Sequence, residues 1–158
     1  LIETGLDALA RDNAEDTKVF ASVYGNTENV ANVLACRLRE RGIKCVMHDV
    51  SVSEHSVIIA DAFKYSHLVF ASVTYNGGVF VNMENLLHDL VAHNLRGRTV
   101  ALVESGSWAL SAAKGMKEIL APLKDTTFID EPFSFKSGLH CEECEALDTL
   151  TDAIIKSI

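Results

Sequence analysis

The chain has 158 residues, of which 48% are hydrophobic and two are proline, so it can form one domain with a substantial core and is not disordered in composition. Its net charge of −8 is concentrated at the two ends, since residues 1–16 sum to −4, residues 130–158 to −5 and the middle to +1. We interpret this acidity mainly as a source of solubility; it argues against a nucleic-acid partner, and neither a signal peptide nor a membrane-spanning run is indicated.

Strand patterns and helix patterns alternate along the chain. Apolar runs of strand length cover 18–22, 43–50, 67–72 and 99–104, and a weaker one lies within 126–136. Helical periodicity runs from Thr27 to a terminating Gly42, and again over 55–64, 83–91, 110–121 and 147–155. Five such alternations predict an α/β fold, a doubly wound five-stranded parallel sheet with helices on both faces. The strand order 2-1-3-4-5 fits five units best.

The first 16 residues stand outside this alternation. Ile2, Leu6 and Leu9 share one helical face, and five acids lie among the remaining positions. Because the sequence begins with leucine, we expect a processed protein or a domain cut from a longer polypeptide. We therefore divide the chain into a linker or N-terminal helical segment, 1–16, and a sheet domain, 17–158.

Three predicted strands end in a serine and open into a loop that contains glycine, at Ser22, Ser72 and Ser105. The carboxyl ends of parallel strands form one edge of the sheet, where ligands bind. The first loop runs directly into a helix, whose unpaired N–H groups and positive end favour a phosphate. It contains no cation, which suits a phosphate that is held and not transferred. The alternative is an ordinary turn capped by Thr27.

The second and third loops favour a flat ligand. Glycines in Tyr75-Asn76-Gly77-Gly78 let the backbone approach a ring, which Tyr75 could cover. The third loop brings Trp108, the only tryptophan, to the same edge; simple packing is the alternative for this side chain. A receiver domain is excluded because Ala21-Ser22 and Ala71-Ser72 stand where it needs acids.

The segment His140-Cys141-Glu142-Glu143-Cys144 allows a metal or redox interpretation. One C-x-x-C pair provides two ligands where zinc takes four, and neither Cys36 nor Cys45 is placed to complete the set. We interpret the segment as the acidic start of the last helix and expect no metal site. Four cysteines without a secretory signal are typical of reduced thiols in a cytoplasmic protein.

Together the three loops resemble those of FMN-binding flavodoxin-like domains, and most closely the C-terminal flavodoxin domain of flavodiiron proteins (A-type flavoproteins). Those loops usually read S-x-Y-G-N-T-E, S-P-T-Y-N-G-G and S-Y-G-W-S-G-G-A, and the likeness extends from about Lys18 to Leu120. Val73, Gly106 and the pair Leu110-Ser111 depart from the pattern. The first residues also look like the linker that follows the metallo-β-lactamase-like domain of that family.

The resemblance implies FMN as the cofactor and assigns residues to its two ends. The phosphate would be bound by Ser22, Tyr24, Gly25, Asn26 and Thr27. One side of the isoalloxazine ring would be lined by Thr74, Tyr75, Asn76, Gly77 and Gly78. The other side would be closed by Ser105, Gly106, Ser107 and Trp108. No residue is expected to act as a catalytic acid or base.

The same resemblance implies an electron-transfer domain of an oxygen or nitric oxide reductase. Its donor would be rubredoxin or a flavin reductase, and its acceptor a diiron site in a metallo-β-lactamase-like domain of a cytoplasmic homodimer. Neither nucleic acid nor membrane is an expected partner. Two alternatives stay open: an FMN-dependent NAD(P)H:quinone reductase, and an interaction module without flavin.

Overall fold

The computed structural model describes residues 17–22, 25–129, 131–136 and 141–158. Its strands are β1 (Thr17–Ser22), β2 (Lys44–Asp49), β3 (His67–Tyr75), β4 (Gly78–Val79), β5 (Thr99–Ser105), β6 (Thr127–Phe128) and β7 (Phe133–Phe135). Its helices are α2 (Gly25–Glu40), α3 (His55–Lys64), α4 (Val81–Ala92), α5 (Ala112–Leu120) and α6 (Cys141–Lys156). None of these helices is long and apolar enough to cross a membrane.

The sheet has the predicted doubly wound order, β2-β1-β3-β5 followed by a divided fifth strand. The strand predicted within 126–136 is two short pieces, and both pair in parallel with β5: β6 with its beginning and β7 with its end. Pro132 lies between the two pieces and has no N–H group to donate to a neighbouring strand, which explains why pairing is interrupted there.

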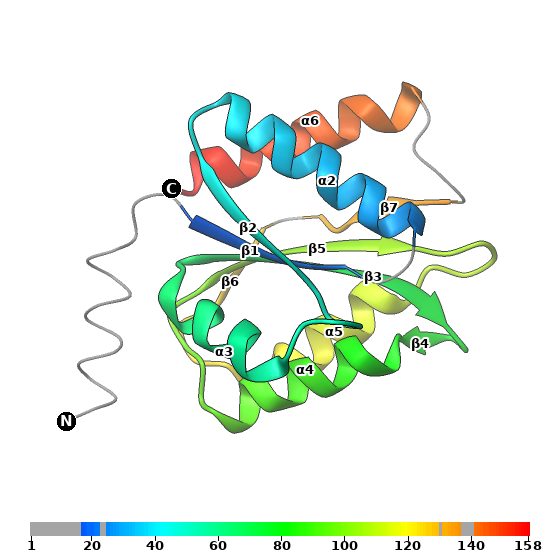
Figure 1. Ribbon diagram of the computed structural model, residues 1–158. Helices are drawn as coiled ribbons and strands as arrows, with labels where there is room; N and C mark the ends of the chain where they lie inside the picture. The colour runs from blue at the N-terminus through cyan, green and yellow to red at the C-terminus, as the bar shows by residue number, and fades with distance from the viewer. Residues whose placement is uncertain (1–16, 23–24, 130, 137–140) are drawn as a thin grey trace.

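Helices cover both faces of the sheet, as Figure 1 shows. Leu68 and Phe70 of β3 pack into a core with α3, α4 and α5, whereas Val69 and Ala71 pack into a second core with α2 and α6. This alternation follows from the two-residue period of a strand, and it confirms the predicted two-sided burial.

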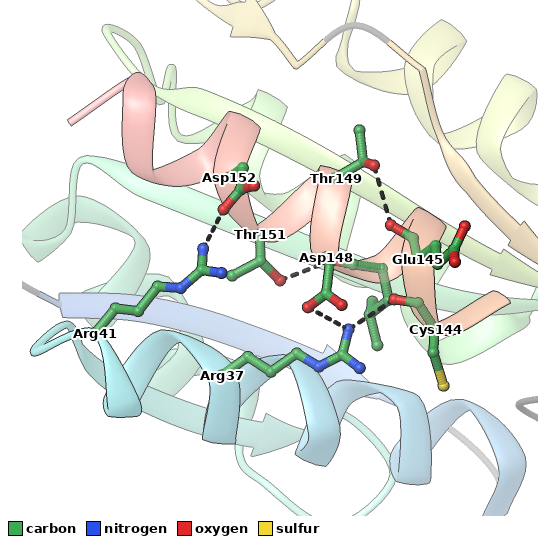
Figure 2. A network of polar contacts seen from close by, with 9 residues as sticks. Arg37, Arg41, Cys144, Glu145, Asp148, Thr149, Thr151 and Asp152 are labelled. Carbon is green, nitrogen blue, oxygen red and sulfur yellow. Dashed lines mark hydrogen bonds and ion pairs between the residues drawn. The ribbon is translucent and has the colours of Figure 1, made fainter. Parts of the chain in front are cut away.

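The last helix lies along α2 and is joined to it by two arginines (Figure 2). Arg37 pairs with Asp148 at 2.9 Å and donates to the carbonyl of Cys144 at 2.9 Å, and Arg41 pairs with Asp152 one turn further along. Because the aspartates are about half exposed, these pairs contribute little stability each. They fix how α6 is placed along α2.

Candidate functional site

The three loops singled out in the sequence leave the same edge of the sheet. β1, β3 and β5 are neighbours, and their parallel register brings Ala21 beside Phe70 and Val73 beside Ser105. The carboxyl ends of these strands therefore meet, which confirms that the loops after them share one edge (Figure 1).

Thr27 joins the first loop to the third. This side chain lies in the first turn of α2, is only 1% exposed, and has its Oγ1 2.7 Å from the Oγ of Ser105, which is 5% exposed. The resemblance puts Ser105 on the ring side, and this hydrogen bond also brings its hydroxyl to the predicted phosphate loop. The side chains of Ser22 and Asn26, and all of Tyr24, lie outside the described residues.

A second helix end reaches this edge, and its N–H groups are already occupied. Thr74 Oγ1 accepts hydrogen bonds from the N–H groups of Ser111 and Ala112, both at 3.2 Å. Glu104 Oε2 accepts from the N–H of Ala113 at 2.8 Å, so the first turn of α5 is closed by a hydroxyl and a carboxylate. The N-terminal end of α5 is therefore less available to an anion that binds at this edge.

Glu104 is a functional candidate that the sequence reasoning missed. It is 7% exposed, and its other oxygen accepts from the hydroxyl of Ser134 at 2.7 Å. The sequence signal for it was an acid inside the apolar strand 99–104, because a carboxylate buried in such a strand almost always has partners.

The second loop is a hairpin, which corrects the prediction of a strand ending at 72 and an open loop over 73–78. β3 continues to Tyr75 and pairs antiparallel with β4. Asn76 and Gly77, with φ of 50° and 75°, form a two-residue turn between them. The Asn-Gly pair was the sequence signal for this turn. The hairpin holds Tyr75, 57% exposed, with its ring edge-on to Phe80 at 6.0 Å.

Gly78 leaves an open face beside that ring. Its φ is not positive, and a Cβ there would meet only the carbonyl oxygen of Tyr75, at 3.8 Å. Neither backbone conformation nor packing thus accounts for glycine at this position. Glycine here leaves room for a flat ligand to lie against the backbone.

The third loop packs against the second and exposes its tryptophan. A Cβ on Gly106 would lie 3.0 Å from the carbonyl oxygen of Ala109 and 3.3 Å from the Cβ of Thr74, so the tyrosine usual here has no room. Trp108 is 94% exposed, which excludes core packing for this side chain. Ser111 has a buried hydroxyl without a partner among the described residues.

No metal site is found in the part of the chain that the structure describes, where His, Cys, Asp and Glu form no group of three or more that could hold an ion. Cys144 lies in α6, which begins at Cys141 as the acidic helix start predicted there. His140 and the side chain of Cys141 lie outside the described residues. Among the described residues, the site at the carboxyl edge thus combines hydroxyls, backbone amides, the Glu104 carboxylate and exposed aromatic rings.

A doubly wound sheet whose carboxyl edge carries a buried threonine hydroxyl in the first turn of a helix, an open glycine backbone and exposed aromatic rings is typical of a protein that binds a nucleotide or flavin. The sequence profile of the flavodoxin family matches residues 19–154, and the chain belongs to that family. It is an FMN-binding electron-transfer domain. This membership favours FMN binding over the alternative of an interaction module without flavin.

Solved structures share the fold. The rubredoxin oxygen:oxidoreductase of Desulfovibrio gigas matches over 91% of this chain with a TM-score of 0.82 and 19% identity. The Flv1 flavodiiron core from Synechocystis sp. PCC6803 matches over 95% with a TM-score of 0.79 and 16% identity. A Streptococcus pneumoniae TIGR4 flavodoxin matches over 92% with a TM-score of 0.76 and 22% identity. No curated protein sequence matches.

The matches differ in how much of the other protein they cover. This chain spans 36% and 37% of the two longer proteins, but 100% of the Streptococcus flavodoxin. Their identities are too low to show more than the common fold.

Proposed function

We propose that this chain is the flavin domain of a cytoplasmic flavodiiron-type oxygen or nitric oxide reductase. In this role it accepts electrons from rubredoxin or a flavin reductase and passes them to a diiron site in a metallo-β-lactamase-like domain. Residues 1–16 are then the linker that follows that domain, and two copies of the whole protein form a homodimer in which the flavin of one subunit serves the diiron site of the other.

The single observation that favours this role is the spacing of the three loops at one sheet edge. Ser22 to Glu28 and Thr74 to Gly78 follow the flavodiiron pattern, and the third loop keeps a tryptophan at Trp108. The name of the Desulfovibrio gigas protein, which pairs rubredoxin with oxygen, agrees with the proposed donor and acceptor.

The described residues fit FMN at both of its ends. The first turn of α2 takes the phosphate, where the buried hydroxyl of Thr27 lies, while Thr74 and Glu104 occupy the competing end of α5. The remaining phosphate contacts come from Ser22, Tyr24, Gly25 and Asn26. The ring lies between two groups of residues, Tyr75, Asn76, Gly77 and Gly78 on one side, and Ser105, Gly106, Ser107 and Trp108 on the other.

These residues bind and orient the cofactor and take no part in bond making. FMN, when bound, supplies the electron transfer itself. Tyr75 and Trp108 are 57% and 94% exposed, so both aromatic side chains are available to cover a flavin ring. A ring covered by them would be shielded from water.

The test is electron entry into the isolated chain. We expect flavin absorbance to remain after incubation with FMN and desalting, and reduced rubredoxin to reduce the flavin faster than NADH or NADPH does. Oxygen or nitric oxide turnover should be slow until the diiron domain is added. Rapid direct oxidation of NAD(P)H with a quinone would instead identify the alternative quinone reductase, and rapid reduction of oxygen to water by this chain alone would contradict the proposal.

A further inference from the structure

A groove of about 650 Å³ lies at the end of the sheet opposite the flavin site. It is lined by the last turns of α3, the segment after α4 and the segment after α5. Because these segments lead into β3, β5 and β6, the groove sits at the amino edge of the sheet, where the proposed electron transfer has no use for it.

The lining combines an apolar floor with a cationic rim. Ile59 and Phe63 of α3 and Leu123 after α5 contribute partly buried apolar side chains. Arg96 and Lys124 contribute exposed cations, and no acid lines the groove among the described residues. Such a surface suits a ligand with an apolar face and negative charges.

A buried arginine connects two of the segments that line the groove. Arg98, 3% exposed, donates to the carbonyls of Ala62 and Phe63 at 3.0 and 2.7 Å, and to the carbonyl of Arg96 at 2.7 Å. A positive charge at the C-terminal end of α3 is favourable, and it fixes this end to the segment before β5. Two sides of the groove are thus preformed.

One segment of the chain has the matching chemistry. Residues 1–16 carry five acids against one arginine, and Ile2, Leu6 and Leu9 are spaced for one helical face. These features have no role in the flavin site. They are what the groove requires, an apolar face for its floor and negative charge for its rim.

The sheet domain also begins at the same edge of the sheet as the groove. β1 begins at Thr17, at the amino edge, and Lys18 pairs with His67, which pairs in turn with Thr99 of β5. Two strand spacings separate β1 from β5, about 10 Å. Residues 10–16 could extend over about 23 Å, enough to carry the preceding apolar positions to the groove.

We propose that residues 1–16 dock in this groove, with their apolar positions on Ile59 and Phe63 and their carboxylates toward Arg96 and Lys124. The tether makes docking intramolecular, so weak contacts suffice to keep the groove filled. This inference does not depend on FMN or on the proposed electron partners, and the two can fail separately.

Zero-length carbodiimide cross-linking of the full chain tests the contact. We expect an amide between Lys124 and a carboxylate of residues 1–16, identified by peptide mass spectrometry. Lys114 of α5, whose side chain is 82% exposed, is the matched lysine away from the groove and should give no such product. Equal cross-linking of both lysines, no product with residues 1–16, or products that join two chains would overturn the proposal.

A pair of variants tests the groove itself. Ala60 is exposed and lines the groove, so Ala60→Glu places bulk and negative charge in it without disturbing the core. Val57, on the same helix and 49% exposed, does not line it and takes the same charge as a control. We expect trypsin to cleave after Arg11 about five-fold faster or more in Ala60→Glu, and at the wild-type rate in Val57→Glu. Unchanged cleavage in Ala60→Glu, with both variants folded by circular dichroism, would overturn docking.

Discussion

Replacing Thr27 by valine removes one hydroxyl from the phosphate loop while keeping a side chain of the same shape. The structure buries this hydroxyl completely and bonds it to Ser105, so the change reaches the loop without an added cavity. A hydrogen bond to a charged group contributes about 1.5–3 kcal/mol. We therefore expect FMN to bind about 10–150-fold more weakly, while riboflavin, which lacks the phosphate, binds nearly as before.

The same substitution also predicts a change in the protein without cofactor. It leaves the buried hydroxyl of Ser105 without its partner, which costs about 1–3 kcal/mol of unfolding free energy. Adding Ser105→Ala should recover part of this loss, because removing both partners of a buried hydrogen bond is nearly neutral. Titrations of FMN and riboflavin fluorescence, with thermal melts of the wild type and the two variants, measure these effects. Equal losses for FMN and riboflavin would refute the assignment of Thr27 to the phosphate.

Further predictions concern the ring side and the packing below it. Since Trp108 is the only tryptophan and is 94% exposed, bound FMN should quench its fluorescence strongly, and Trp108→Ala should release flavin faster; unquenched emission would place the indole away from the ring. Gly115→Ala should lower the melting temperature although alanine favours helix, because its Cβ would lie 2.8 Å from Val79 Cγ2 and overpacking costs about 1–3 kcal/mol. Gly78→Ala is the matched control, with melting unchanged and FMN affinity reduced; the reverse pattern would contradict the role given to Gly78.

The sequence predicted the fold well because its signals are local. The apolar periodicity of α3 predicted its bounds, 55–64, as the structure has them. The C-terminal glycine of α2 was also predicted correctly: Gly42 has φ of 81°, and Gly42 and Ile43 donate to the carbonyls of Arg39 and Leu38. Each of these features depends on residues close together in the chain.

What escaped prediction depends on distant residues or on turn chemistry that was overlooked. The acids of α6 looked like solvated charge, yet Asp148 and Asp152 pair with arginines more than a hundred positions earlier, which no local pattern shows. At the site, the three loops were located because parallel strands must end at one edge. Thr74 and Glu104 take their capping roles from neighbours in space, so their contacts with α5 appeared only in the structure.

The buried carboxylate of Glu104 influences how an anionic ligand is oriented at the carboxyl edge of the sheet. Among the helix ends there, α5 already holds a buried carboxylate against its first turn, so it repels a second anion, whereas the residues from Ser22 to Thr27 include no charged side chain. A cofactor with a phosphate at one end and a neutral ring at the other is then disfavoured in a pose that sets its phosphate against the first turn of α5, because like charges repel. The carboxylate that holds a helix in place thus also orients a ligand it need never touch.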